Sequence, residues 1–98
     1  MAAYVLAEVE ILHREGYAEY SALVPGTLAP FGGRFLARGG NVQPLEGEWP
    51  TLRRVILEFP DADAARAWWS SPIYQKPKAM RQAHSRSRLL LLEGIPPE

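Results

Sequence analysis

The chain of 98 residues contains no cysteine. This absence excludes disulfides, cysteine nucleophiles, thiolate zinc sites and cysteine-ligated iron–sulfur clusters. A net charge is also missing, because 11 Lys and Arg balance 11 Asp and Glu, so a general attraction to nucleic acid or to an anionic membrane is not supported. No apolar run approaches the roughly 20 residues of a membrane span, and Glu8 and Glu10 interrupt the apolar N-terminus where a secretory signal would continue. We therefore expect a cytoplasmic protein that binds neither nucleic acid nor membrane.

Sequence motifs of several enzyme classes are absent as well. There is no Gly-x-Ser-x-Gly, P-loop or dinucleotide fingerprint, and Gly39-Gly40 has neither the spacing nor the following helix that such a fingerprint needs. His13 and His84 are the only histidines, and no other ligand-type residue is spaced to complete a metal site with them. We expect neither a metal nor a cofactor.

The composition, 47% hydrophobic and 22% charged, is typical of a globular protein, and the length fits one domain over residues 1–98. Apolar periodicity, Pro and Gly divide this domain into elements. They are a strand over 3–11, a helix over 14–31 that breaks at Pro25, an extended segment over 34–46, a strand over 53–59, a helix over 62–70 capped by Asp61, a helix over 73–84 that restarts near Pro77, and a strand over 86–93. Gly39-Gly40-Asn41 fits either a tight hairpin or one long strand bent by a glycine bulge.

This order is βαββαβ. It indicates an α+β, ferredoxin-like fold with a four-stranded antiparallel sheet in the order 4-1-3-2 and helices on one face. Residues 89–92 are four leucines, apolar on both faces of their strand, and Tyr4, Leu6 and Ile56 add apolar groups to the face that the helices leave open. The simplest cover for that face is a second copy packed sheet to sheet, so we expect a homodimer.

Several segments together resemble a known family. They are residues 32–40 (GGRFLARGG), Glu46-Gly47, residues 55–60 (VILEFP), residues 71–75 (SPIYQ) and residues 92–94 (LEG). In combination they are similar to the small bacterial DUF1330 domain, whose function is unassigned. The resemblance covers nearly the whole chain and implies membership of the dimeric α/β-barrel superfamily, with its ferredoxin-like fold and sheet-to-sheet dimer. It also favours the bent strand at Gly39-Gly40. Because that superfamily includes cofactor-free monooxygenases, isomerases, haem enzymes and ligand-binding regulators, the resemblance implies no particular reaction.

Two carboxylates and one histidine are candidates for proton transfer. Strand alternation places Glu8 and Glu58 on the face turned toward the expected partner, where a buried carboxylate must be paired or protonated. Each is therefore either a general acid or base or the partner of Arg54, Arg88 or an arginine of the second copy. Glu58 is the stronger candidate because it lies in a family-matching segment. His84 is either a helix-end histidine or a catalytic group.

Arginines and aromatic residues are candidates for ligand binding. Arg34 and Arg38 share a face if their strand is regular, and Arg38 either holds a carboxylate or phosphate or pairs with Glu46 or Glu58. Residues 76–88 carry five Lys and Arg without an acid, so they form either an anion site with Tyr74 and Arg81 or a solvated helix face. The aromatic residues of the helices line a pocket or fill the core. These residues are Tyr17, Tyr20, Trp68, Trp69 and Tyr74.

Three functions remain open. The first is a homodimer that binds an anionic or aromatic metabolite through Tyr20, Arg38, Trp68, Tyr74 and Arg81. The second is a cofactor-independent isomerase or monooxygenase in which Glu58 or His84 moves a proton. The third is a structural or regulatory dimer without a pocket.

Overall fold

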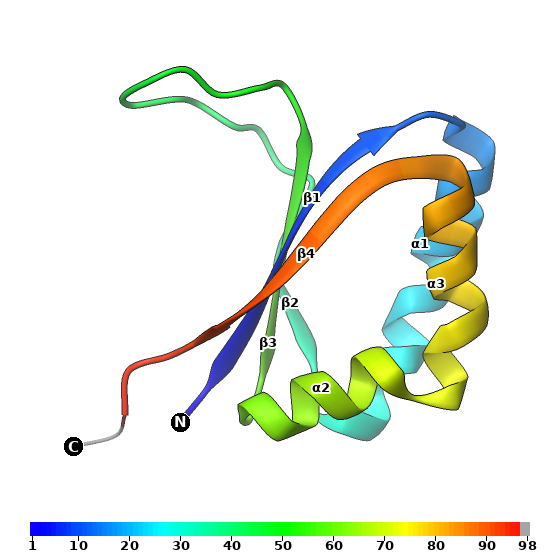
Figure 1. Cartoon of the computed structure of the whole chain (residues 1–98), viewed down its shortest axis with the longest axis vertical. Helices are drawn as coiled ribbons and strands as arrows, with labels where there is room; N and C mark the ends of the chain where they lie inside the picture. Colours follow the sequence, from blue (N-terminus) through cyan, green and yellow to red (C-terminus); the bar gives the residue numbers. More distant parts are fainter. Residues whose placement is uncertain (97–98) are drawn as a thin grey trace.

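A computed structural model describes residues 1–96, so the last two residues of the domain expected over 1–98 lie outside the described part. The elements are β1 (Ala3–Ile11), α1 (Arg14–Leu28), a short 3-10 helix η1 (Ala29–Phe31), β2 (Arg34–Arg38), β3 (Arg53–Phe59), α2 (Ala62–Ser70), α3 (Pro72–His84) and β4 (Ser85–Glu93). The strands form one antiparallel sheet in the order β2-β3-β1-β4, which confirms the expected ferredoxin-like order. All three α-helices lie on one side of the sheet (Figure 1).

The core lies between this inner face of the sheet and the helices. Alternation buries Ala3, Val5 and Val9 of β1 as expected. The indole of Trp68 fills the centre of the layer: it is 1% exposed, its ring centroid lies 4.1 Å from that of Tyr74, and its Nε1 donates to Thr27 Oγ1 at 3.0 Å. The expectation that Trp69 also faces inward is wrong, because its ring is 47% exposed beneath the Lys78 ammonium.

Both helices that contain an internal proline run through it without a break. α1 continues past Pro25 and α3 past Pro77, so the two predicted breaks are wrong. A proline removes one backbone donor and so frees the carbonyl four residues earlier. In α1 that carbonyl belongs to Ser21, and the guanidinium of Arg38 donates to it at 2.5 Å in place of the missing helical bond.

The β2 strand differs from both expectations for Gly39-Gly40. It ends at Arg38, residues 40–52 form a long loop without regular structure, and the register slips between Phe35 and Ala37. The irregularity therefore lies before the glycines, and neither a tight hairpin nor a long strand bent at Gly39 is present. This slip turns Arg38 to the inner face while Arg34 stays on the open face, so the expectation that the two share a face is wrong.

The open face of the sheet carries the apolar groups expected of it. Leu90 and Leu92 are 56% and 53% exposed, with Leu6 and Ile56 half-buried beside them. No helix covers this side (Figure 1). Among residues 1–96, no helix is both long enough and apolar enough to cross a membrane.

Candidate functional site

A small cavity lies between the inner face of the sheet and the helices. Its volume is about 30 Å³, and aliphatic side chains such as Val5, Val55 and Leu89 form much of its wall. Since one water molecule needs at least about 10–15 Å³ measured in this way, the cavity has room for two or three. Pockets that enclose whole metabolites are typically about 300–1,000 Å³. The space suits the head group of a ligand.

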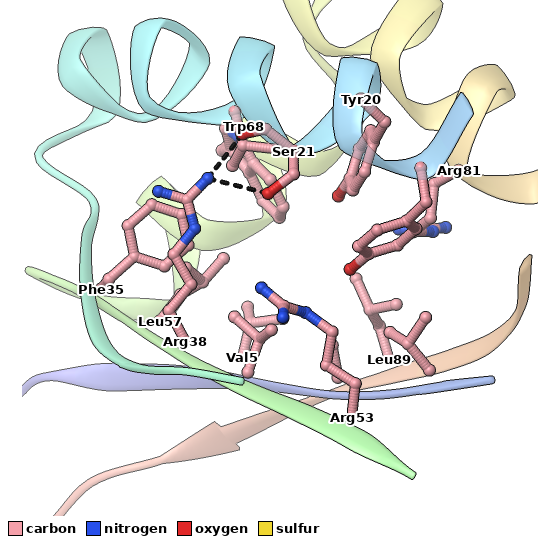
Figure 2. Close-up of a pocket in the computed structure, with 15 residues that line it drawn as sticks. Val5, Tyr20, Ser21, Phe35, Arg38, Arg53, Leu57, Trp68, Arg81 and Leu89 are labelled. Atoms are coloured by element: carbon pink, nitrogen blue, oxygen red, sulfur yellow. Dashed lines mark hydrogen bonds between the residues drawn. The ribbon is translucent and has the colours of Figure 1, made fainter. Parts of the chain in front are cut away.

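Three arginines converge on this cavity from three different elements. Arg38 comes from β2, Arg53 from β3 and Arg81 from α3, and none of the acidic side chains of residues 1–96 lines the cavity with them. Arg81 is only 5% exposed, and the Nε atoms of Arg53 and Arg81 are buried without a hydrogen-bond partner. In Figure 2 the guanidinium of Arg53 extends from the sheet toward Ser21 and Tyr20 on α1. A buried cation normally has a counter-charge and filled hydrogen bonds, so these guanidinium groups are suited to contact an anion.

Two tyrosines supply neutral donors beside the arginines. The hydroxyls of Tyr20 and Tyr74 lie 2.8 Å apart, and Arg81 Nη1 donates to Tyr74 Oη at 3.0 Å. Burial raises the pKa of both phenols above their usual value, so both stay protonated at neutral pH. The bond between the two hydroxyls uses one of their two hydrogen atoms, and where Tyr74 is the donor the hydrogen atom of Tyr20 stays free on the cavity wall.

Strand alternation and one glycine bring Arg53 into the cavity. Arg53 precedes Val55 and Leu57 on the same face of β3, so its side chain emerges on the inner side. Its guanidinium packs over Gly39, where a Cβ atom would collide with it, and Gly39 has a φ of +70° that favours glycine. The Arg38-Gly39 pair thus contributes one guanidinium and makes room for another.

Arg38 lies at the outer end of the cavity. It is exposed, and it donates to the carbonyl oxygen of Ser21 at 2.5 Å and to Ser21 Oγ at 2.9 Å. Its guanidinium also stacks 4.1 Å from the centroid of the Phe35 ring. These contacts join β2 to α1 at the edge of the cavity.

The structure brings together all five residues predicted to bind a ligand. Tyr20, Arg38, Trp68 and Arg81 line the cavity, and Tyr74 is hydrogen-bonded to two of them. Tyr17, one of the aromatic residues predicted to line a pocket or fill the core, lines it too, and so do Arg53 and Ser21, which were not predicted from the sequence. The signal for Arg53 was available, because it alternates with the buried Leu57 and Phe59 of its strand.

The two candidates for proton transfer lie elsewhere. Glu58 is on the open face, 2.6 Å from Arg34 Nη2. His84 ends α3, where its ring packs over Gly16 and its Nδ1 lies 3.4 Å from that of His13. Neither side chain lines the cavity. Within residues 1–96, no three His, Asp or Glu side chains are grouped as metal ligands.

The five basic residues over 76–88 do not form one patch. Arg81 is buried in the cavity, while Lys76 is exposed on α3, and Arg86 and Arg88 lie on the open face of β4. Lys76 therefore fits the prediction of a solvated helix face. Of the five basic residues, Arg81 alone fits the prediction of an anion site.

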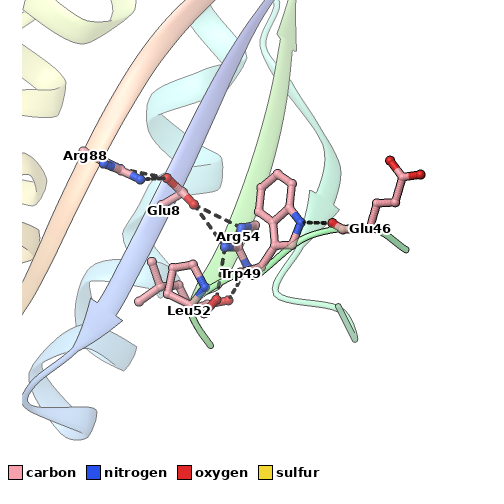
Figure 3. A network of polar contacts seen from close by, with 7 residues as sticks. Glu8, Glu46, Trp49, Leu52, Arg54 and Arg88 are labelled. Atoms are coloured by element: carbon pink, nitrogen blue, oxygen red, sulfur yellow. Dashed lines mark hydrogen bonds and ion pairs between the residues drawn. The ribbon is translucent and has the colours of Figure 1, made fainter. Parts of the chain in front are cut away.

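Glu8 forms the centre of an ion-pair network on the open face (Figure 3). Its carboxylate accepts from Arg88 Nε at 2.7 Å and from Arg54 Nε at 3.2 Å. The hydrogen bond from Arg88 is the main reason that the pKa of Glu8 is lowered, with a smaller contribution from Arg54. This arrangement matches the ion-pair interpretation of Glu8.

The model of one protein family, the domain of unknown function DUF1330, matches residues 2–95. The chain belongs to the DUF1330 family. The match confirms the resemblance seen in the sequence. No curated protein matches the chain.

Solved structures share the fold of this DUF1330 protein. A protein of unknown function from Rhodopseudomonas palustris is 24% identical, with a TM-score of 0.78 over 98% of this chain and 84% of the other. A dimeric ferredoxin-like protein of unknown function from Jannaschia sp. CCS1 is 20% identical, with a TM-score of 0.73 over 96% of this chain and all of the other. SnoaB, a cofactor-independent oxygenase from Streptomyces nogalater, is 13% identical, with a TM-score of 0.65 over 98% of this chain and 95% of the other. At these identities the likeness establishes the fold alone.

Proposed function

We propose that this DUF1330 protein is a homodimer that binds a small organic anion in the cavity between its sheet and its helices. The observation that carries the proposal is the buried guanidinium of Arg81, which lines a cavity with Arg38 and Arg53 and has no carboxylate there. An anion would supply the missing charge and accept from the unpartnered Nε atoms of Arg53 and Arg81.

The volume limits what enters. About 30 Å³ accommodates a carboxylate head of the size of formate or acetate. A larger acid, including an aromatic one, requires Arg38 to leave Ser21 so that the rest of the molecule extends past Phe35. Apolar and aromatic walls around a charged centre favour a carboxylate with a short apolar or aromatic tail over a phosphate or sugar.

The homodimer is supported by the open face and by the relatives. Leu90 and Leu92 are more than half exposed on a sheet face that no helix covers. Two similar proteins, from Jannaschia and from Thermobifida fusca, are described as dimeric ferredoxin-like proteins. Sheet-to-sheet packing would bury these leucines on both copies.

The other two functions have less support. The SnoaB fold is compatible with a cofactor-independent oxygenase or isomerase, but among the described residues no carboxylate or imidazole that could act as a base near neutral pH lines the cavity. A dimer without a pocket leaves the buried, unpaired Arg81 unexplained.

Thermal unfolding tests the binding directly. Formate, acetate and benzoate, each compared with its neutral amide, should raise the Tm of the wild type, while the amides should not. A ligand at about 100 times its Kd adds about 2.7 kcal/mol, which corresponds to a rise in Tm of about 10 °C or more for a domain of this size.

The matched variants are Arg81→Met and Arg34→Met. Without an anion, Arg81→Met should be as stable as the wild type or more stable, because it removes a buried cation that lacks a counter-charge. It should also lose the response to carboxylates. Arg34→Met, on the open face, should keep that response. The proposal fails if no carboxylate stabilises the wild type, or if Arg81→Met responds as the wild type does.

A further inference from the structure

The long loop between β2 and β3 carries features that the cavity does not explain. This loop, residues 40–52, is called the β2–β3 arm below. It leaves the sheet on the side away from the helices (Figure 1). Leu45 in the arm is 95% exposed and Val42 is 47% exposed. An almost fully exposed leucine on a projecting segment indicates a contact outside the chain.

The root of the arm is fixed to the open face. The Arg54 guanidinium donates to the carbonyl oxygens of Pro50 at 3.2 Å and Leu52 at 3.3 Å. Trp49 lies 5.6 Å from the Arg54 guanidinium and borders, with Leu6, Ile56 and Leu90, a hollow of about 410 Å³ on that face. The tip of the arm therefore projects from a fixed base on the side where the second copy is proposed to pack.

The charges of the arm and the pairing register of the strands indicate which segment of the second copy the tip of the arm contacts. The arm carries Glu46 and Glu48 and no basic residue. On the opposite edge strand, β4, Arg86 and Arg88 pair with Glu10 and Glu8 of their own chain, yet their side chains are each 77% exposed, so a further carboxylate can reach them. Val9 of β1 pairs with both Arg53 and Ser87, so the root of the arm and these two arginines lie at the same end of the sheet.

A two-fold axis parallel to the strands would relate the two copies of a sheet-to-sheet dimer. Such an axis places the β2 edge of one copy over the β4 edge of the other and keeps the strand ends together. We infer that the β2–β3 arm of each copy wraps over β4 of its partner, with Leu45 against Leu90 and Glu46 and Glu48 near Arg86 and Arg88. The inference rests on the homodimer proposed above and adds the segment that holds it.

Cross-linking between two single-cysteine variants tests this contact, since the native chain has no cysteine. Leu45→Cys and Leu90→Cys protein are mixed, allowed to exchange subunits and treated with a short bismaleimide. The mixture should give about tenfold more covalent dimer than a mixture of Ala67→Cys and Leu90→Cys, because a local contact raises the effective concentration of the two thiols. Ala67 is exposed on α2, on the helical side of the sheet.

Light scattering on the same samples separates the two proposals. A dimeric mass with cross-linking no greater than the control overturns the arm contact and leaves the homodimer standing. A monomeric mass overturns both. A dimeric mass with the expected cross-link supports both.

A second variant does not touch the packed sheet. Glu46→Lys/Glu48→Lys should weaken dimerisation about tenfold by placing like charges together, and added salt should reduce the difference. Glu15→Lys/Glu19→Lys makes the same charge change on the exposed side of α1. This variant should leave the dissociation constant of the dimer unchanged. Equal dimer constants for the two double variants would overturn the arm contact.

Discussion

The arginines on the two faces of the sheet differ in what they contact. On the open face each arginine has a carboxylate of its own chain: Arg34 pairs with Glu58, Arg54 and Arg88 with Glu8, and Arg86 with Glu10. On the inner face Arg38, Arg53 and Arg81 line a cavity that no acidic side chain of the described part of the chain enters. The same residue type thus forms internal ion pairs on one side and remains available to a ligand on the other.

Burial makes this difference significant. An exposed ion pair such as Arg34–Glu58 contributes at most about 1 kcal/mol, so the open-face pairs matter more for solubility and pairing geometry than for stability. A buried cation is expensive to leave unpaired, so the inner-face group is stable only with compensation from tyrosine oxygens, water or a bound anion. The inner face therefore contains the candidate binding site, and the open face is the candidate dimer interface.

The largest expected loss of stability distinguishes the buried side of α2 from its exposed side. Trp68→Ala should lower the free energy of unfolding by about 3–5 kcal/mol, because it leaves a large void under Phe59 and Tyr74 and frees Thr27 Oγ1. Trp69→Ala, next along the chain but 47% exposed, should cost less than about 1 kcal/mol. Urea denaturation measures both, and equal losses would contradict the assignment of Trp68 to the core.

A smaller effect is expected at the glycine that makes room for Arg53. Gly39→Ala should cost about 1–2 kcal/mol, because the residue has a φ of +70° and the new methyl group meets the Arg53 guanidinium. It should also weaken carboxylate binding by displacing that guanidinium. Gly40→Ala is the matched control, since nothing lies within 4 Å of the Cβ it would add. If the two variants bind carboxylate equally well, Arg53 has no part in the site.

The buried tyrosines predict a dependence of stability on alkaline pH. Burial raises the pKa of Tyr20 above its ordinary 10.0, while an unfolded tyrosine ionises near that value. Unfolding then releases a proton, so the free energy of unfolding should fall as pH rises through about 10. Tyr20→Phe should reduce that slope in urea denaturation measured at pH values from about 8 to 11. An unchanged slope would indicate that Tyr20 is not buried as described.

The smallest expected effect on stability is that of Glu8 on the open face. Arg88 and Arg54 lower the pKa of Glu8, so Glu8 stabilises the fold above its ordinary pKa of 4.5, and this contribution is lost as pH falls through the lowered value. Glu8→Gln should therefore lower the stability slightly and by a constant amount at neutral and alkaline pH, flatten the acid side of the profile, and leave the alkaline slope unchanged, as measured by urea denaturation across pH. A changed alkaline slope would mean that the two faces are coupled.

Much of the fold could be predicted from local patterns. The alternation in 3–11 and the β-rich run at 53–59 gave strands with the bounds observed. Pro25 and Pro77 misled the prediction, because a proline opposes a helix only as strongly as packing and alternative donors allow, and Arg38 supplies such a donor to Ser21.

The candidate site could be predicted in part. Tyr74 and Arg81 lie seven residues apart on one helix, so helical spacing could place them together. The face of Arg38 depended on a register slip between Phe35 and Ala37 that no local signal announced. Glu58 and His84 were candidates by chemistry alone, and their positions follow from tertiary structure.

Nuclear magnetic resonance of the arginine side chains tests anion binding in the cavity most directly. In nitrogen-15-labelled protein, the Nε–H signals of Arg53 and Arg81, assigned with Arg53→Met and Arg81→Met, are followed as formate or acetate is added. Because these two Nε atoms are buried without partners, we predict that both signals shift together and saturate, while those of Arg34 and Arg88 stay in place. Shifts confined to the open-face arginines, or none at all with either anion, would contradict anion binding by Arg53 and Arg81.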